Sequence, residues 1–358
     1  GAIMVTGSHI PADRNGLKFY SRTGEITKTD EAAINGALWR AAGKAESEMA
    51  QDEDAAARFV ERYIEACGPR ALKGRKIGLY AHSAVGRDDL AAILQGLGAE
   101  VVEYGRSETF IPVDTEAVDP DTRAQIAAWV TADGLDALVS TDGDSDRPLL
   151  ADETGTIVPG DVMGQITAEM LGAETVVTPI SSNSGVQKKG FGAVRLTRIG
   201  SPFVIAGMEE AGGKVVGYEA NGGFLLGFEA QGPAGPLAPL ATRDCMLPLI
   251  MTLIAAGGGT VSERVAQEPP VVTMADRLQE VPQERSQPFV ARLADSAEAR
   301  ASFGAEGPPP RSMTTAGAPS EKPDASGSGA LGSELMRWMP PLSRISSASE
   351  YLKSPDDD

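Results

Sequence analysis

The chain has 358 residues, which is enough for two or three domains and a sizeable core. Its 32 basic and 50 acidic side chains give a net charge of 32 − 50 = −18, which argues against nucleic acid or an anionic membrane as partners but permits a local cationic pocket for a phosphorylated substrate. The two cysteines, Cys67 and Cys245, form neither a disulfide framework nor a zinc motif and indicate a cytoplasmic protein, and no apolar run approaches a membrane span.

The chain opens on an apolar run at residues 3–5 that predicts the end of a buried strand. A domain rarely begins inside its own core strand, so we expect the natural N-terminus to lie upstream. The run leads into Thr6-Gly7-Ser8-His9 and then into the turn signal Asn15-Gly16. Ser8 is therefore expected on a loop after a strand, where α/β sheets place their chemistry. It is a nucleophile, a phosphate carrier or an ordinary turn residue.

Alternating helical and apolar patterns organise the next part of the chain. They predict two helices within residues 30–67, strands at 76–80 and 100–103, helices at 88–97 and 125–132, and a buried strand at 135–139. Strands that alternate with helices indicate a parallel sheet in an α/β fold. His82 follows the first of these strands, and a structural role in hydrogen bonding is favoured over a catalytic one.

Three alternating carboxylates, Asp142, Asp144 and Asp146, follow the strand at 135–139 directly. We expect Gly143 to let the chain turn sharply between them. Carboxylates this close repel one another unless a cation compensates their charge. A hard divalent cation does so through oxygen ligands, and Mg²⁺ usually keeps water or phosphate oxygens as well. The stretch therefore predicts a Mg²⁺ site at a strand end, with room for a phosphate.

Two other interpretations of the acidic stretch stay open. Its spacing, with Glu153 downstream, resembles an EF-hand loop of a calcium-binding module. However, Arg147 stands where that loop needs glycine, Pro148 follows it, and a strand precedes it in place of a helix. A solvated acidic turn is the second alternative, because Asp and Gly are common turn residues.

A further α/β unit begins near residue 172. Its patterns predict strands at 175–180 and 214–219 and helices at 203–211 and 244–256. Glu219 and Asn221, followed by two glycines, could hydrogen-bond sugar hydroxyls, or the segment could be an ordinary glycine hairpin turn. From residue 307 onward Pro, Ser and Gly dominate, which predicts an aberrant or disordered tail.

Taken together, these loops resemble those of the α-D-phosphohexomutase superfamily, over roughly residues 1–300. The phosphoserine loop, commonly Thr-Ala-Ser-His-Asn-Pro, resembles Thr6-Gly7-Ser8-His9-Ile10-Pro11, and the Asn-Gly-x-Lys that follows it matches Asn15 to Lys18. The metal loop Asp-Gly-Asp-x-Asp-Arg is met fully by Asp142 to Arg147. The sugar loop Gly-Glu-x-Ser-Gly-His is met partly, because Glu219 is kept while Asn221 stands for Ser and a glycine for His.

The resemblance implies an isomerase whose Ser8 carries a phosphoryl group, and it assigns roles by similarity. Mg²⁺ would be the cofactor and a hexose 1,6-bisphosphate the activator. The implied metal ligands are Ser8, Asp142, Asp144 and Asp146; the catalytic residues are Ser8, Lys18, Arg147 and His9; the substrate-binding residues are Glu219, Asn221, Gly222 and Arg198.

The implied fold is a succession of mixed-sheet α/β domains around a central cleft. The expected domains are a phosphoserine domain at 1–70 that is incomplete at its N-terminus, a metal-binding domain at 71–171, a sugar-binding domain at 172–258, the start of a phosphate-binding domain at 259–306, and the tail at 307–358. We find no Arg-x-Ser-Gly-Thr phosphate loop of the kind that the family's fourth domain carries.

The implied reaction interconverts mannose 6-phosphate and mannose 1-phosphate through a phosphoserine and a hexose bisphosphate. Phosphoglucomutase and phosphoglucosamine mutase activities, or a catalytically impaired fragment of such an enzyme, are the alternatives. The expected partner is a small sugar phosphate.

Overall fold

The structure is a computed structural model that describes residues 1–8, 15–22, 24–37, 52–271 and 283–302. The chain divides into two units, Gly1–Met274 and Ala275–Asp358. His9 and the tail predicted from residue 307 onward lie outside the described residues. None of the described helices combines the length and apolarity that crossing a membrane requires.

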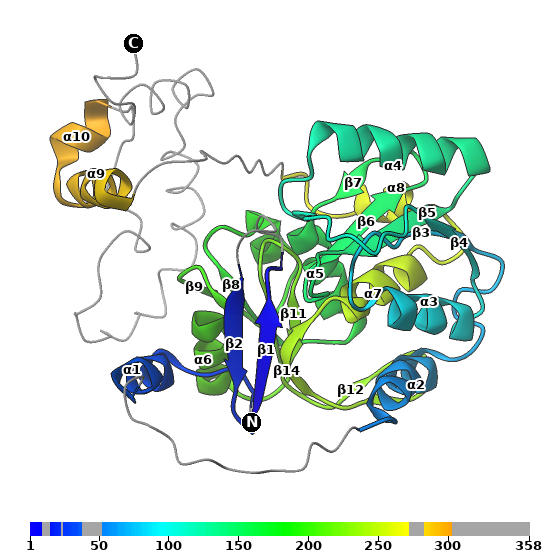
Figure 1. Cartoon of the computed structure of the whole chain (residues 1–358), viewed down its shortest axis with the longest axis horizontal. Helices are drawn as coiled ribbons and strands as arrows, with labels where there is room; N and C mark the ends of the chain where they lie inside the picture. The colour runs from blue at the N-terminus through cyan, green and yellow to red at the C-terminus, as the bar shows by residue number, and fades with distance from the viewer. Residues whose placement is uncertain (9–14, 23, 38–51, 272–282, 303–358) are drawn as a thin grey trace. The chain divides into compact units, whose positions relative to one another are not determined.

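The first large sheet lies in the first unit and carries the acidic stretch (Figure 1). Its strand order is β4 (Glu100–Tyr104), β3 (Lys76–Tyr80), β5 (Ala137–Thr141), β6 (Pro148–Asp152) and β7 (Ile157–Val158). β3 pairs in parallel with β4 and β5, whereas β6 and β7 are added antiparallel. The predicted parallel strands are confirmed, but the sheet as a whole is mixed because the chain turns back after β5.

The second large sheet, also in the first unit, repeats this topology. Its order is β9 (Ala193–Thr197), β8 (Thr175–Pro179), β10 (Val215–Tyr218), β11 (Phe224–Leu226) and β14 (Leu240–Asp244). β8 pairs in parallel with β9 and β10, and β11 and β14 are added antiparallel. In each sheet the third strand along the chain turns back into the fourth, so β5–β6 and β10–β11 are equivalent hairpins.

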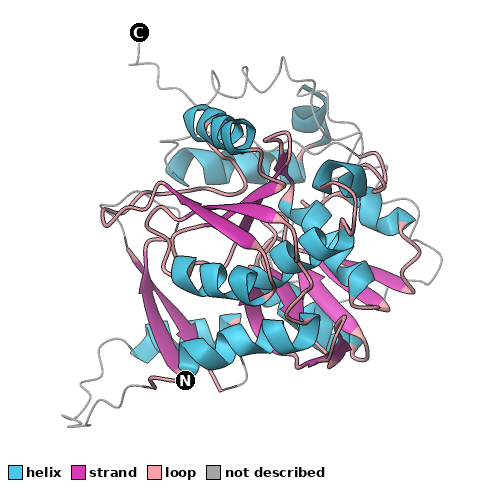
Figure 2. Ribbon diagram, turned by 90° about the vertical axis from the view of Figure 1, so that its right-hand side faces the viewer, coloured by secondary structure: helices cyan, strands magenta, loops and turns pink. Residues whose placement is uncertain are grey.

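Helices flank the strands of these sheets (Figure 2). The first unit contains α1 (Lys28–Ala37), α2 (Ala55–Cys67), α3 (Arg87–Gly96), α4 (Pro120–Asp133), α5 (Gly160–Met170), the 3₁₀ helix η1 (Ser184–Lys188), α6 (Ser201–Ala211), α7 (Met246–Ala255) and α8 (Val261–Val265). The second unit contains α9 (Gln283–Asp295) and α10 (Ala297–Ser302).

α4 begins five residues earlier than the spacing at 125–132 predicts, because its start is capped. The Asp119 carboxylate accepts a hydrogen bond from the Thr122 amide at 2.9 Å, and Pro120 is the first helical residue. A proline there loses no helical hydrogen bond, and its fixed φ suits the helix. Gly134 ends the helix in the left-handed conformation, with φ of 59°.

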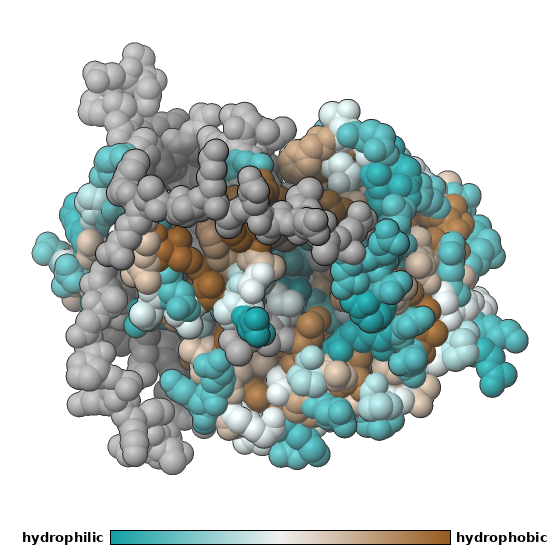
Figure 3. All heavy atoms as spheres, turned by 60° about the horizontal axis from the view of Figure 1, so that its bottom comes forward, coloured by the Kyte–Doolittle hydropathy of each residue, from teal (hydrophilic) through white to brown (hydrophobic). Residues whose placement is uncertain are grey.

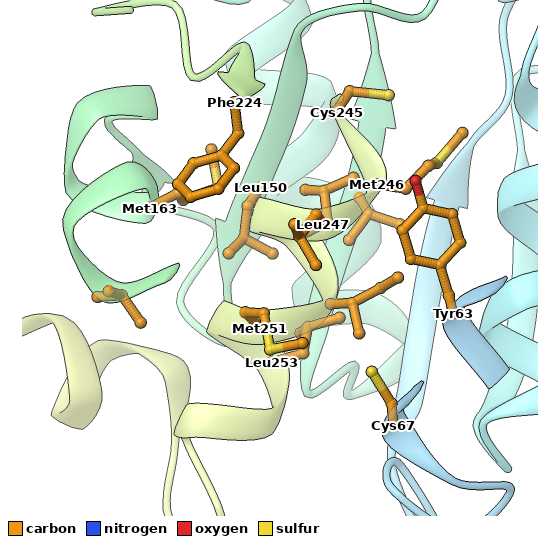
Figure 4. Close-up of a cluster of buried hydrophobic side chains, with 14 of the residues drawn as sticks. Tyr63, Cys67, Leu150, Met163, Phe224, Cys245, Met246, Leu247, Met251 and Leu253 are labelled. Carbon is orange, nitrogen blue, oxygen red and sulfur yellow. The ribbon is translucent and has the colours of Figure 1, made fainter. Parts of the chain in front are cut away.

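α7 lies in the core of the first unit, and its residues from Met246 to Leu253 are all buried. Asp244 caps the helix, because its Oδ1 accepts hydrogen bonds from the amides of Met246 and Leu247 at 2.9 and 3.1 Å. The Tyr63 hydroxyl donates to Asp244 Oδ2 at 2.8 Å. Figure 4 shows the α7 side chains between two groups from neighbouring elements, Tyr63 and Cys67 on one side and Met163 and Phe224 on the other.

Two short antiparallel pairs complete the fold of the first unit. They are β1 (Ala2–Thr6) with β2 (Gly16–Tyr20), and β12 (Ala230–Gln231) with β13 (Pro236–Leu237). The prediction of a strand at residues 3–5 is confirmed, but its burial is not. Ile3 and Val5 are 63% and 66% exposed, because β1 forms a two-stranded sheet with β2 alone among the described strands. Figure 3 shows exposed hydrophobic residues among hydrophilic ones on one face of the molecule.

Candidate functional site

The acidic loop is the turn of the β5–β6 hairpin. Asp142 holds it in place, because its Oδ1 accepts hydrogen bonds from the amides of Asp146 and Arg147, each at 3.1 Å. The turn that was predicted at Gly143 is confirmed: Gly143 and Asp144 are its central residues, and the Ser145 amide closes it by donating to the Asp142 carbonyl at 3.2 Å. Ser145, which follows, has a left-handed φ of 59°. Gly143 serves a close approach: a Cβ there would lie 2.5 Å from the Ser8 carbonyl oxygen and 2.9 Å from the Phe110 ring.

The three carboxylates of this loop can hold a divalent cation. One oxygen each from Asp142, Asp144 and Asp146 lies within 4.8 Å of the others. Asp142 and Asp144 are buried, and Asp146 is partly so. Oδ1 of Asp144 and Oδ1 of Asp146 are buried without a hydrogen-bond partner. Such atoms are costly unless something binds them, so the donor set fits a hard cation such as Mg²⁺.

Electrostatics in the loop support the same conclusion. Burial, together with the neighbouring Asp146 and Asp144, raises the pKa of Asp142. Burial also opposes the charge on Asp144, but hydrogen bonding to the Lys18 ammonium outweighs it and lowers the pKa of that carboxyl. One carboxyl is thus pushed toward its neutral form while its neighbour stays charged, as is usual for closely spaced acids.

Ser8 reaches the acidic loop from the end of β1. Its hydroxyl donates a hydrogen bond to Asp142 Oδ2 at 2.8 Å, and its amide donates to Thr6 Oγ1 at 2.8 Å. Its φ of 47° places it in the left-handed region, which a non-glycine residue adopts at some cost. The structure therefore brings the predicted nucleophile and a predicted metal ligand into direct contact.

Lys18, on β2, pairs with two of the loop carboxylates. Its ammonium contacts Asp144 Oδ2 in a short ion pair and Asp146 Oδ2 at 2.7 Å. Burial works against its charge, but the attraction of Asp146 and the hydrogen bonds to both carboxylates outweigh burial and raise the pKa of Lys18. Lys18 is therefore protonated near neutral pH and acts as a donor at this site.

Arg147, at the end of the acidic loop, adds a second cation. Its Nε lies 3.9 Å from Asp142 Oδ2 and 3.8 Å from Asp146 Oδ1. These separations are ion-pair distances and exceed those of a hydrogen bond. Both predicted cations, Lys18 and Arg147, thus border the acidic loop.

The predicted sugar loop is the turn of the β10–β11 hairpin. The amide of Glu219 donates to the Gly223 carbonyl at 3.1 Å, and Asn221 Oδ1 accepts from the Gly223 amide at 3.0 Å. The hairpin alternative is thus the observed backbone, and Glu219 and Asn221 lie buried within it. Gly222 has φ of 87°, and a Cβ there would lie 2.6 Å from Pro148, so this glycine lets the turn pack against the end of the acidic loop.

Two further residues that the sequence patterns did not single out, Arg243 and Glu25, contact the residues of the acidic loop and the sugar loop or one another; together these residues are called the acidic cluster. Arg243, at the end of β14, reaches Asp146 Oδ2 at 2.9 Å, Glu25 Oε1 at 3.4 Å and Glu219 Oε2 at 3.8 Å. Glu25 also accepts a hydrogen bond from the Ser201 hydroxyl at 2.6 Å. The one available signal was a charged pair, Arg243 with Asp244, placed directly before the apolar run of α7.

Other candidates lie elsewhere. The Arg198 guanidinium lies 5.2 Å from the centre of the Phe203 ring, and among the described residues no ion pair joins it to the acidic cluster. His82 is buried, with Nε2 2.9 Å from the Thr141 carbonyl oxygen, which agrees with the structural role favoured from the sequence. Glu153, the twelfth position of the EF-hand alternative, bonds instead to the Ser262 hydroxyl.

A pocket of about 340 Å³ opens beside Lys18 and Arg243. This volume is within the range of small-molecule sites. The other lining residues come from β2, the segment that follows β2, α1 and the start of α6. They are Leu17, Phe19, Tyr20, Glu25, Ile26, Glu31, Ile34, Asn35 and Pro202.

Comparisons with known proteins identify a consistent set of relatives. Residues 57–155 match the model for phosphoglucomutase/phosphomannomutase α/β/α domain II, and residues 152–272 match that for domain III. A phosphomannomutase of Sinorhizobium fredii is 45% identical over 82% of this chain and 65% of its own length. A phosphomannomutase of Salmonella muenchen is 42% identical over 78% of this chain and 59% of its own length. A phosphoglucosamine mutase of Ruegeria is 28% identical over 59% of this chain and 50% of its own length.

Solved structures agree on the fold. A phosphoglucomutase/phosphomannomutase family protein of Burkholderia thailandensis superposes with a TM-score of 0.64 at 20% identity, covering 82% of this chain and 63% of that one. The open form of a Paramecium phosphoglucomutase, pp63/parafusin, superposes with a TM-score of 0.55 at 15% identity, covering 74% of this chain and 56% of that one. The chain spans less than two thirds of the length of the curated relatives reported above.

Proposed function

The chain belongs to the phosphoglucomutase/phosphomannomutase family, and from that premise we propose that it catalyses phosphoryl transfer between two hydroxyls of a hexose phosphate. The family and the α/β fold that the motifs indicated are thereby confirmed. We assign mannose 6-phosphate and mannose 1-phosphate as the substrates, because the relatives at 45% and 42% identity are named phosphomannomutases, whereas a phosphoglucosamine mutase matches at 28%.

The observation that carries this proposal is the 2.8 Å hydrogen bond from the Ser8 hydroxyl to Asp142 Oδ2. A serine that merely fills a turn has no need of a buried carboxylate from a loop more than a hundred residues away. Next to a cation site it lies where a phosphorylated side chain is stabilised. A bound Mg²⁺ would be held by Asp142, Asp144 and Asp146, and it would neutralise charge on the transferring phosphoryl group.

The residues of the chain then divide the work. A sugar hydroxyl oxygen attacks the phosphorus of phosphorylated Ser8, the bond to Ser8 Oγ breaks, and the hydroxyl proton passes to Ser8 Oγ. In the second half-reaction Ser8 Oγ attacks the other phosphate of the bisphosphate, the bond between that phosphorus and the sugar oxygen breaks, and the Ser8 proton passes to the sugar oxygen. Lys18, which is held protonated by its carboxylate neighbours, donates hydrogen bonds to the charge that develops on oxygen. Glu219 and Asn221 bind sugar hydroxyls in either orientation of the bisphosphate.

The test is the intact mass of the purified chain before and after incubation with a hexose 1,6-bisphosphate and Mg²⁺. We expect a gain of one phosphoryl group in the wild type and none in Ser8→Ala. Ser21→Ala is the matched control, because Ser21 is an exposed serine whose hydroxyl bonds to the Gly24 carbonyl, and this variant should keep the gain.

A folded wild-type chain that gains no phosphoryl group would refute the proposal. Stabilisation by Ca²⁺ alone, without phosphoryl transfer, would instead favour the calcium-binding alternative. A gain that survives Ser8→Ala would place the phosphate on another residue and remove Ser8 from the mechanism.

A further inference from the structure

Arg243 lies where three segments of the chain meet. Asp146 comes from the acidic loop, Glu219 from the sugar loop and Glu25 from the segment after β2, and the Arg243 guanidinium is within ion-pair distance of all three. Its side chain is only 11% exposed. Nothing in the proposed roles of Ser8, Lys18 or Glu219 accounts for a buried arginine at this position.

The three contacts are unequal, and the inequality matters. The 2.9 Å separation from Asp146 is that of a hydrogen bond, whereas those from Glu25 and Glu219, 3.4 and 3.8 Å, are looser. Nε of Arg243 and Oε1 of Glu25 are both buried without a hydrogen-bond partner. The guanidinium is thus held firmly by the acidic loop and has unused hydrogen-bonding capacity toward the other two carboxylates.

The charge balance around Arg243 shows what would move it. In the part of the chain that the structure describes, the cluster contains five carboxylates, namely Asp142, Asp144, Asp146, Glu219 and Glu25, and three cations, namely Lys18, Arg147 and Arg243. With every carboxylate ionised, the formal charge is 3 − 5 = −2, which one divalent cation balances. Such a cation shares Asp146 with Arg243, and two like charges on one carboxylate weaken each other's hold.

We propose that Arg243 is a positioning residue that couples a divalent cation on the acidic loop to the orientation of Glu219. A cation on Oδ1 of Asp146 weakens the attraction between Oδ2 and the guanidinium, which then shifts toward Glu219 and Glu25, so the sugar loop is ordered when the metal is present. The coupling is reciprocal, because Glu219 draws Arg243 away from Asp146 and thereby favours the metal. The naming of Glu219 as a sugar ligand rests on the proposed function.

The guanidinium carries several N–H donors in a fixed planar arrangement, so this one side chain can contact both loops. A lysine carries the same charge on a single nitrogen and cannot span the same carboxylates with fixed geometry. Arg243→Lys therefore separates charge from geometry, whereas Arg243→Met removes both. Arg58→Met is the matched control, because Arg58 forms an exposed ion pair with Asp52 and its loss changes the net charge of the chain equally.

The first measurement is the dissociation constant of Mn²⁺ alone, by electron paramagnetic resonance of free Mn²⁺ at neutral pH. Without Arg243 the cluster carries 2 − 5 = −3, so we expect Arg243→Met to bind Mn²⁺ about tenfold more tightly. Arg243→Lys should stay within about threefold of the wild type, and Arg58→Met should match it. Glu219→Gln should weaken Mn²⁺ binding about fivefold in the wild type but less than about twofold in Arg243→Met.

The second measurement is the binding of mannose 1-phosphate by calorimetry at saturating Mg²⁺. We expect both Arg243 variants to bind it about tenfold more weakly than the wild type, because neither positions Glu219. The Mn²⁺ titration needs no turnover, so it tests the coupling even if Ser8 takes up no phosphoryl group. Failure of the proposed function and failure of this inference are therefore distinguishable.

Three results would overturn the inference. One is an unchanged or weaker Mn²⁺ affinity in folded Arg243→Met. Another is an equal effect of Glu219→Gln with and without Arg243. The third is a folded wild-type chain that binds no Mn²⁺ at millimolar concentration. If Arg243→Met does not fold, wild-type sugar-phosphate affinity in Arg243→Lys would overturn it instead.

Discussion

Gly143→Ala tests whether the close approach of Ser8 to the acidic loop determines phosphoryl transfer. An added Cβ would lie 2.5 Å from the Ser8 carbonyl oxygen, whereas real Cβ contacts begin near 3.0 Å and are ordinary at 3.4 Å. The Ser8 backbone must therefore retreat by between 3.0 − 2.5 = 0.5 Å and 3.4 − 2.5 = 0.9 Å. A displacement of this size at a reacting group costs about 10- to 100-fold in rate.

The stability of this variant should change much less than its rate. Overpacking costs about 1–3 kcal/mol, and replacing a glycine whose φ is not positive returns about 0.4–1 kcal/mol through the unfolded chain. We therefore expect a net loss below about 3 kcal/mol in the free energy of unfolding, measured by urea denaturation. The rate of phosphoryl uptake by Ser8 is followed by mass spectrometry in a single turnover.

Gly258→Ala is the control for this experiment, because its φ is also not positive and no atom lies within 4 Å of the added Cβ. This variant should keep the wild-type rate of phosphoryl uptake and the wild-type free energy of unfolding. Wild-type uptake in Gly143→Ala would refute the reasoning, because the contact would then not position Ser8. Loss of uptake together with unfolding would show that Gly143 matters for the fold alone.

Two further substitutions test the core and the charge of a buried acid. Tyr63→Phe should lower the free energy of unfolding by about 1–3 kcal/mol in urea denaturation, because it removes the hydroxyl that donates to buried Asp244, and an unchanged value would show that Asp244 finds another donor. Burial raises the pKa of Asp161 from 3.8 to about 6, so the folded chain keeps a proton that the unfolded chain loses. Its stability should therefore fall by up to about 3 kcal/mol as the pH rises from about 4 to about 6, and this slope should be smaller in Asp161→Asn by pH-dependent denaturation. An identical slope in that variant would assign the dependence to other groups.

Three buried strands, β3, β8 and β10, were predictable because they are continuous apolar runs. β3, β8 and β10 lie within one or two residues of their predicted bounds. β6 was not predicted, because it follows the acidic loop at once and begins with a proline, a residue that usually argues against a strand. Here Pro148 is the first residue of its strand, where a proline is tolerated.

The loop motifs predicted several of the residues that lie together in the site, but they did not predict the backbone conformation of the acidic loop or the contacts of Arg243. Ser8, Lys18 and Arg147 were assigned to one site from their motifs, and in the structure each of them contacts a carboxylate of the acidic loop. The left-handed φ of Ser145, which follows the predicted turn at Gly143, could not be predicted, because φ depends on the completed hairpin. Arg243 was missed because its partners come from segments far apart in the sequence, so no local pattern marks it.

The site is assembled from three antiparallel strand pairs that belong to different sheets: Ser8 follows β1 ahead of β2, the acidic loop joins β5 to β6, and the sugar loop joins β10 to β11. The backbones of the β5–β6 and β10–β11 turns are each held by hydrogen bonds within their own hairpin, at Asp142 and at Glu219. Under the proposed function, a substitution in the β10–β11 turn would therefore change which sugar binds while the carboxylates of the β5–β6 turn stay in place. The sugar that binds and the group that carries the phosphate would then depend on different sheets of the fold.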